Sequence, residues 1–224
     1  MKKTQLTESP ATGSYSVSWQ GALRAVHGGD VSGKVPLQQF FERKNLYAVG
    51  PVAELDGEIT ALDGTFHIAR VKHGEIKTDS DLSTTASFLV WSEVFAWKPP
   101  VLFGKNVDNH AQLEKQIEFL ALKEGIDTTK PFPFIIEGTI ESVDYHILIP
   151  KKPDQAESSH IDSAKKISSA GVAAKIIGFF SKNHEGIFTH RGSAAHLHVL
   201  ESNGNSGHVD EIVLNAEVLV SFPQ

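Results

Sequence analysis

"LYAVGPVAELDGEITALDGTFHIARV", residues 46–71, carries the clearest β-sheet signal in the chain. Val, Ile and Thr residues flank the pair Asp63-Gly64 on both sides, and apolar residues alternate with small or polar ones. An Asp-Gly pair between two alternating segments is the strongest short-range indication of a β-hairpin. We therefore predict two antiparallel strands joined by a turn at Asp63-Gly64.

Further strand-like segments lie on both sides of this hairpin. Apolar alternation begins over residues 15–19, and two more runs, over 87–98 and 132–150, stop at prolines. One helix is expected over 109–125, where apolar residues recur on one face and a glycine follows the last turn. Many strands with few helices predict an α+β fold, β-rich, with mostly antiparallel or mixed sheets.

The polarity of the chain predicts two subdomains. Residues 1–14 are rich in Ser, Thr and Pro and are expected to form a flexible N-terminus. An N-terminal mixed-sheet subdomain over 15–150 would be followed by a polar connection over 151–170. A C-terminal β subdomain over 171–224 would carry the histidines discussed below.

The composition excludes several classes of protein. The net charge of −6, with 21 basic and 27 acidic residues and no basic cluster, argues against nucleic acid as the main partner. The sequence has no apolar run near the roughly 20 residues of a membrane helix. It has no cysteine, which excludes disulfides, thiolate metal sites and cysteine nucleophiles. No signal peptide is expected in the sequence as given, so a cytoplasmic and an exported protein both stay open.

The segment "AAHLHVLESNGNSGHVDEI", residues 194–212, holds three of the eleven histidines. Residues two apart in a strand point to the same face, so His196 and His198 project together. The polar loop that follows turns the chain back and brings His208 onto the returning strand.

Loop length decides whether His208 joins the other two histidines. A two-residue turn at Asn203-Gly204 would place His198 opposite Val209 and turn His208 to the other face. A three-residue loop over 202–204 places His198 directly opposite His208, with Cβ atoms ~5 Å apart. We predict this odd-length loop and a metal site on the hairpin.

Three neutral imidazoles at this spacing suit a divalent transition metal. Zinc is the commonest such ion, and nickel, copper, iron(II) and manganese stay open. Three protein ligands leave a coordination position for water or substrate, as in catalytic sites. The alternative is three ordinary surface or partly buried histidines. His184 and His190, just upstream, are candidates for a fourth ligand or for a partner that orients a ligand ring, or else are solvated loop residues.

Several segments together resemble the α-acetolactate decarboxylase family. His-Leu-His followed by Gly-His-Val is similar to the family's zinc-binding segment, and "LDGEIT" is similar to its N-terminal signature. The segment "PFPFIIEGTIESVDYHILIPKK" lies where the family has a Pro-Phe strand, so the likeness runs from about residue 45 to 215 in the family's order. The resemblance implies a zinc site at His196, His198 and His208 and a catalytic glutamate at Glu58.

The sequence departs from the family at three places. Alignment on Pro150 puts Ile147 where the family has an active-site arginine, and strand parity puts Tyr145, not His146, on the face of Ile147. The family's second catalytic glutamate lies in a C-terminal extension, for which the residues after His208 offer no counterpart. Ala195 also replaces the aromatic residue that precedes His-Leu-His.

Without that arginine, either another cation or another substrate is expected. The candidate cations are His190, Arg191 and Lys182 in the loop before the histidine strand. We take His190, together with Glu58, as the predicted catalytic residues. A bidentate guanidinium is not interchangeable with other cations, so its loss indicates altered specificity.

The resemblance implies decarboxylation of 2-acetolactate to acetoin. Zinc chelated by the substrate's hydroxyl and carbonyl oxygens would accept the electrons left by CO2, and Glu58 would transfer a proton. Two alternatives stay open: another metal-dependent reaction of a small hydroxy-oxo acid, or a non-catalytic module that binds a metal or a small molecule. The expected partner is a small 2-hydroxy-3-oxo acid, and the resemblance also implies a homodimer.

Overall fold

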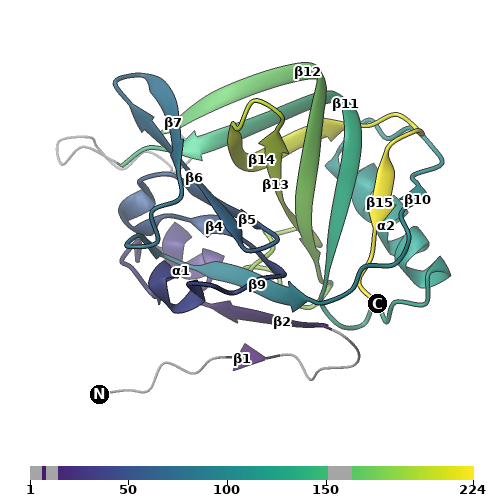
Figure 1. Cartoon of the computed structure of the whole chain (residues 1–224), viewed down its shortest axis with the longest axis horizontal. Coiled ribbons are helices and arrows are strands. Elements are labelled where there is room, and N and C mark those ends of the chain that lie inside the picture. Colours follow the sequence, from purple (N-terminus) through teal and green to yellow (C-terminus); the bar gives the residue numbers. More distant parts are fainter. Residues whose placement is uncertain (1–6, 9–14, 151–162) are drawn as a thin grey trace.

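The structure is a computed structural model that describes residues 7–8, 15–150 and 163–224. Its described part is built mainly from two antiparallel sheets, with the short helix α1 (Leu23–His27) beside one and the longer α2 (His110–Lys123) beside the other (Figure 1). The α+β class and the antiparallel pairing predicted from the sequence are confirmed. Neither α-helix is long and apolar enough to cross a membrane.

The first sheet has seven strands in the order β1-β2-β9-β4-β5-β6-β7. Their bounds are β1 Thr7–Glu8, β2 Tyr15–Gln20, β4 Leu46–Pro51, β5 Glu58–Leu62, β6 Thr65–Lys72, β7 Glu75–Asp79 and β9 Leu89–Val94. A separate pair joins β3 (Val35–Pro36) to β8 (Thr85–Ala86), and two 3₁₀ helices, η1 (Leu37–Phe40) and η2 (Ala53–Leu55), lie before and after β4. Thr7–Glu8 pairs with β2, whereas the rest of the expected flexible N-terminus lies outside the described residues.

The hairpin predicted at Asp63-Gly64 joins β5 to β6. Leu62 pairs with Thr65, so the loop has two residues, and both have positive φ, 50° at Asp63 and 77° at Gly64. This backbone suits the primed turns that match strand twist. A Cβ on Gly64 would lie 2.3 Å from the Arg43 carbonyl oxygen, so the close approach of another backbone segment also requires glycine.

The second sheet has six strands in the order β10-β15-β11-β12-β13-β14. Their bounds are β10 Val101–Leu102, β11 Phe132–Leu148, β12 Ala164–Phe180, β13 Ala195–Glu201, β14 Ser206–Val213 and β15 Leu219–Ser221. An additional pairing of β14 with β11 closes β11, β12, β13 and β14 into a ring of four strands. This closure brings a strand from before residue 150 against the histidine hairpin.

The strand β12 differs from the polar connection expected over 151–170. Residues 164–170 begin this strand and pair with the end of β11, while 151–162 lie outside the described residues. The first half of β12 is half-buried or exposed, so its polar composition is compatible with a strand whose backbone is satisfied by β11. Because β10 and β11 share a sheet with β12–β15, the sheet spans both of the expected subdomains.

Side-chain alternation separates the layers of the molecule. Val49 of β4 points toward the second sheet and packs in one cluster with Ile177 and Phe179 of β12. Its neighbour Ala48 points the opposite way, into a cluster that contains Phe40 of η1. The first sheet therefore has one face covered by its own connections and one face packed against the second sheet.

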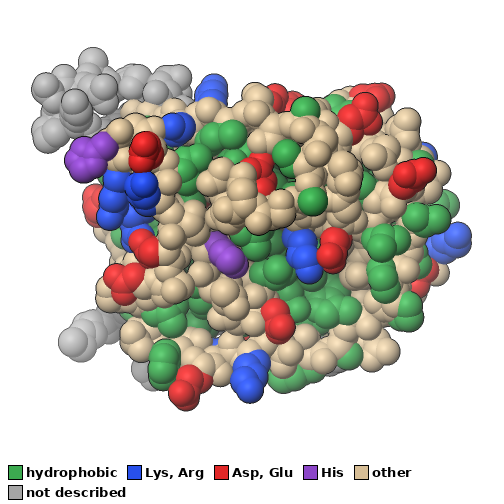
Figure 2. All heavy atoms as spheres, turned by 45° about the horizontal axis from the view of Figure 1, so that its top comes forward, with side chains coloured by type: hydrophobic (Ala, Val, Ile, Leu, Met, Phe, Trp, Pro, Cys, Tyr) green, Lys and Arg blue, Asp and Glu red, His purple; other side chains and the backbone are tan. Residues whose placement is uncertain are grey.

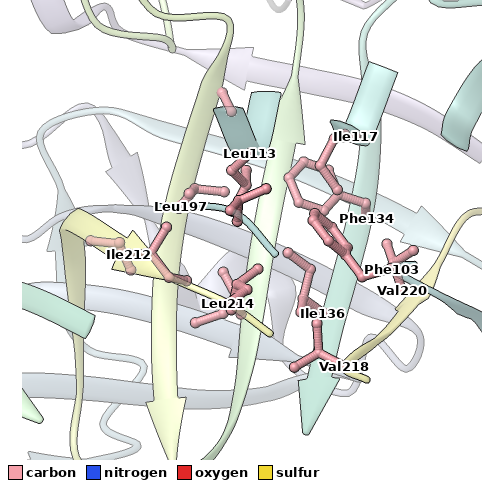
Figure 3. Packing of buried hydrophobic residues seen from close by; sticks show 14 of the residues in the cluster. Phe103, Leu113, Ile117, Phe134, Ile136, Leu197, Ile212, Leu214, Val218 and Val220 are labelled. Atoms are coloured by element: carbon pink, nitrogen blue, oxygen red, sulfur yellow. The ribbon is translucent and has the colours of Figure 1, made fainter. Parts of the chain in front are cut away.

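The second sheet forms its own core against α2. Leu113 and Ile117 of α2 project onto the strands, where Figure 3 shows them on the same side as Phe134 and Leu197. The expected cap is present, because the Gln112 backbone N–H donates to the Asn109 side chain at 3.0 Å. Full burial of each such apolar side chain contributes about 1.5–3 kcal/mol, so this core anchors the histidine hairpin.

The surface carries mixed charge. On the face drawn in Figure 2, Lys and Arg side chains are interspersed with Asp and Glu, and hydrophobic side chains show between them.

Candidate metal and active site

The hairpin β13–β14 brings the three predicted histidines together. His198 pairs directly with His208, and the Glu201 N–H donates to Asn205, so the loop consists of residues 202–204. The odd-length loop predicted from the sequence is confirmed. Leu197, between the first two histidines, points into the core cluster on the opposite face. One face of the hairpin thus holds imidazoles, and the other holds the strand in place.

The ring nitrogens of the triad are arranged as metal ligands usually are. Candidate ligand nitrogens of His196, His198 and His208 all lie within 4.8 Å of one another. His196 Nδ1 donates to the Phe188 carbonyl oxygen at 2.8 Å, and His198 Nδ1 lies 3.0 Å from Thr60 Oγ1. Such contacts fix the rings of His196 and His198 and leave their other nitrogens for a metal.

The triad also has a polar atom that needs a partner. His198 Nε2 is fully buried and has no hydrogen-bond partner in the described part of the chain. His196 Nε2 lies 3.1 Å from His208 Nδ1, and because the proton of a neutral His196 is on Nδ1, His208 Nδ1 is the donor in this contact. A buried nitrogen lone pair without a partner is costly, and a divalent transition ion satisfies it. The donor set therefore fits the implied metal.

Burial keeps these three imidazoles neutral. It lowers the pKa of His198 to about 3, and it lowers the pKa values of His196 and His208 well below 6.5, with further lowering by neighbouring histidines. A neutral imidazole has a free lone pair, which is the form that binds a metal.

Glu58, to which the family resemblance assigns a catalytic role, lies beside the triad. Its Oε2 is 3.7 Å from His198 Nε2, and the side chain is 2% exposed. Burial, followed by the charge of Asp210, raises the pKa of Glu58 well above its usual value. These surroundings favour the protonated carboxylic acid over the carboxylate.

The strand β5 explains why Glu58 points at the triad. Glu58 and Thr60 share the face that looks toward the second sheet, while Ile59 packs into the cluster on the other face. Gly57, just before the strand, has φ 124°, and a Cβ there would lie 2.2 Å from the Ala69 carbonyl oxygen. Glycine in the Asp-Gly-Glu motif therefore lets β5 begin with its first side chain at the site.

A histidine–aspartate pair flanks the triad on the other side. His146 of β11 pairs directly with His208 of β14, and their ring centroids are 5.0 Å apart. His146 Nδ1 lies 2.8 and 3.0 Å from the two carboxylate oxygens of Asp210. Asp210 is two residues after His208, so it shares the face of that histidine. The sequence analysis did not predict this pair. Strand parity could have placed Asp210 on the face of His208, but nothing in the sequence indicated that β11 pairs with β14.

Tyr145 and Ile147, on the other face of β11, are fully buried, and Tyr145 packs in the core. The parity predicted for this strand is therefore confirmed, and the side chains that reach the cavity from it are His146 and Leu148.

Of the three candidate cations in the loop before β13, one reaches the site and two do not. His190 reaches the site: its ring centroid is 4.8 Å from that of His208, and burial lowers its pKa to about 4. Arg191 is 97% exposed and lies near Glu185, while Lys182 forms an ion pair with Glu118 on the surface. His184 packs on Phe188, one layer behind the triad, and its Nδ1 contacts Ser181.

A cavity of about 500 Å³ lies next to the histidine triad. Two of the metal-ligand candidates, His196 and His208, line it together with Glu58, His146 and His190. Apolar side chains on the wall include Leu23, Val26, Leu55, Phe88, Leu148 and Val209, and further polar side chains, among them Glu114 and Asp210, also line it. The helix α1 is fixed here because the Leu23 N–H donates to the Ile187 carbonyl oxygen. A concave, mainly apolar site with a few convergent polar groups is typical of small-molecule binding.

Comparison with known proteins identifies the family of this chain and structures that share its fold. The family model described as alpha-acetolactate decarboxylase matches residues 17–223. An acetolactate decarboxylase from Bacillus subtilis subspecies spizizenii shares the fold with TM-score 0.73 and 18% identity, over 91% of this chain and 84% of that one. A Staphylococcus aureus protein of unknown function, similar to alpha-acetolactate decarboxylase, gives TM-score 0.69 at 18% identity, over 92% and 84%.

The alpha-acetolactate decarboxylase of Bacillus subtilis strain 168 gives TM-score 0.67 at 19% identity, over 91% of this chain and 84% of that one. No curated protein matches the chain significantly in sequence. The match of the family model over nearly the whole chain shows that this protein belongs to the alpha-acetolactate decarboxylase family.

Proposed function

We propose that this protein is a zinc-dependent lyase that decarboxylates 2-acetolactate to acetoin. The observation that carries the proposal is the buried histidine triad beside a cavity, with the buried carboxyl group of Glu58 3.7 Å from His198 Nε2. His196, His198 and His208 would hold the metal. A zinc ion in this position supplies Lewis-acid polarisation of the substrate's adjacent hydroxyl and carbonyl oxygens.

Glu58 is the proton donor in this proposal. When CO2 leaves, the electron pair of the broken carbon–carbon bond stays with the substrate, and that carbon must then take up a proton. Burial raises the pKa of Glu58, so we assign its carboxyl group as the source of this proton. After transfer, the ionised group recovers its proton from solvent, and the apolar wall of the cavity limits the access of water during the reaction.

His190 is the second residue to which we assign a catalytic role. Its Nε2 is buried and has no partner in the described part of the chain, and its ring lies 4.8 Å from that of His208. From this position it would form a hydrogen bond to substrate on the side of the loop 181–194. The homodimer implied by the family resemblance stays a prediction, which light scattering on the purified protein tests.

A product assay tests the proposed reaction. Zinc-loaded protein is given racemic 2-acetolactate, and acetoin is followed by its colour reaction for the wild type and for Glu58→Gln. The wild type should form acetoin, and Glu58→Gln should keep its zinc and lose product formation. A wild type that binds one zinc and forms no acetoin would contradict the proposal and favour another small hydroxy-oxo acid.

A further inference from the structure

The substrate proposed above is an anion, yet the cavity offers it no strong cation. Among the described residues that line the cavity there is no lysine or arginine. Its basic side chains are imidazoles, and two of these, His196 and His208, belong to the metal triad. Under the proposed function, one of the remaining histidines must therefore receive the substrate's carboxylate.

Of the four remaining histidines that line the cavity, His190 lies on the side of the loop 181–194, where its hydrogen bond to substrate is assigned above, and two others are placed for other tasks. His110 Nε2 lies 3.3 Å from Glu114, whose carboxylate also accepts hydrogen bonds from Ser193 and from the backbone N–H of Ala195. That cluster ties α2 to the start of β13. His27, at the end of α1, is exposed to solvent, where water screens its interactions.

His146 has a different environment from these two. It is 6% exposed, and Asp210 holds its Nδ1 at 2.8 Å, so the ring cannot rotate without losing that bond. Since Nδ1 faces Asp210, Nε2 lies on the far side of the ring, and the side chain lines the cavity. A carboxylate partner at Nδ1 also stabilises the ring when Nε2 donates a hydrogen bond to an anion.

The position of His146 favours contact with substrate over contact with metal. His196, His198 and His208 form the set of ligand atoms that lie within 4.8 Å of one another, and His146 is not a member. Its ring nevertheless lies 5.0 Å from that of His208, so it borders the space next to the metal position. Glu58 borders the same space from the side of β5.

We propose that His146, oriented by Asp210, binds the carboxylate of the substrate and thereby selects a 2-hydroxy-3-oxo acid over the corresponding neutral ketone or diol. His146 is the specificity residue, and Asp210 is the positioning residue. The inference rests on the proposed function for its substrate class, but it concerns binding and can be tested without turnover.

Two stable ligands that differ by one carboxylate provide the test. The full-length protein loaded with Co2+ is titrated with 2,3-dihydroxy-2-methylbutanoate and with butane-2,3-diol, and binding is read from the visible spectrum of the metal. His146→Leu should weaken binding of the acid roughly ten- to hundredfold, the contribution of one charge-assisted hydrogen bond, and should change diol binding little. His146→Arg should restore part of the acid binding.

His73→Gln is the matched control, because it removes an exposed imidazole in the β6–β7 turn and should leave both affinities unchanged. Asp210→Asn should weaken acid binding less than His146→Leu, with metal content unchanged. An equal loss for both ligands, or a loss of cobalt from His146→Leu, would overturn the proposal and make His146 part of the metal site. Unchanged acid binding would overturn it as well. Neither ligand is decarboxylated, so these outcomes are separate from a failure to form acetoin.

Discussion

The histidine triad lies between two flanks, the strand β5 with Glu58 and the strand β11 with His146. Each flank contributes one buried ionisable group, but the surroundings of the two groups differ. On the β5 flank, Glu58 is buried beside His198, which is itself neutral, so no opposite charge favours its ionised form. On the β11 flank, His146 is buried to a similar degree, but Asp210 lies at hydrogen-bond distance from it. Burial together with the nearby negative charge of Asp210 favours the protonated form of Glu58, whereas burial with a hydrogen-bond partner orients His146.

Removal of a ligand common to both flanks should have the largest effect. His198→Ala deletes the nitrogen that has no partner, so we expect loss of tight zinc binding and a fall in metal-dependent activity of at least ~10³-fold. Metal analysis after dialysis and the acetoin assay measure the two effects. His73→Gln serves as the control, and full zinc occupancy in His198→Ala would remove His198 from the metal site.

The β5 flank alone is tested by Glu58→Gln. This substitution keeps the shape of the side chain and removes its acidic proton, so we expect kcat to fall roughly 10²- to 10⁴-fold while zinc content and KM change little. His146→Leu should instead act mainly on KM. If both variants gave the same division between kcat and KM, the proposed difference between the flanks would be wrong.

The pH dependence of stability should show the same contrast in the metal-free protein. The triad pKa values are lowered on folding, so their contribution to the unfolding free energy is complete above pH 6.5 and falls as the pH decreases. At pH 5 His198, whose pKa is about 3, should by itself cost about 2 kcal/mol relative to pH 7, and His196 and His208 should add to that cost. The pKa of Glu58 is raised, so its contribution is present below pH 4.5 and lost at higher pH.

Between pH 7 and pH 5 Glu58 therefore opposes the histidines. Glu58→Gln should make the loss of stability on acidification steeper than in the wild type. Urea unfolding of metal-free protein at several pH values measures both slopes. A stability that is constant from pH 7 to pH 5 would show that the three imidazoles are not buried in their neutral form.

A smaller effect is expected from the group that orients His198. Thr60→Val preserves the shape of the side chain but removes the hydroxyl that lies 3.0 Å from His198 Nδ1. Loss of such a partner should weaken zinc affinity roughly tenfold, with little change in the unliganded fold. Thr65→Val, on the exposed start of β6, is the control. Competition with a zinc chelator measures the affinities, and equal values for both variants would contradict an orienting role for Thr60.

The features set by local spacing could be predicted from the sequence. His196 and His198 share a face through strand parity, and the three-residue loop 202–204 brings His208 opposite His198. The turn at Asp63-Gly64 follows from the conformations that those two residues adopt. The position of Glu58 came from the family resemblance, because a glutamate at the start of a strand does not by itself indicate burial.

The β11 flank could not be predicted in the same way. His146 and Asp210 are 64 positions apart, and they meet because β14 pairs with β11 to close the ring of strands. That pairing contains an irregularity between Asp144 and Tyr145, which changes the register and leaves no trace in the periodicity. The first half of β12 could not be predicted for a related reason. Its side chains are polar, and it is held by backbone pairing with β11 more than by burial.

The central claim is that the triad holds a metal on which decarboxylation depends. The most direct measurement compares acetoin formation from racemic 2-acetolactate by one preparation of wild-type protein in three states: stripped with chelator, reloaded with one equivalent of Zn2+, and stripped again. We expect activity only in the reloaded state, with acetoin and CO2 released in equal amounts. Equal activity in all three states, or none in protein that holds one zinc, would contradict this account.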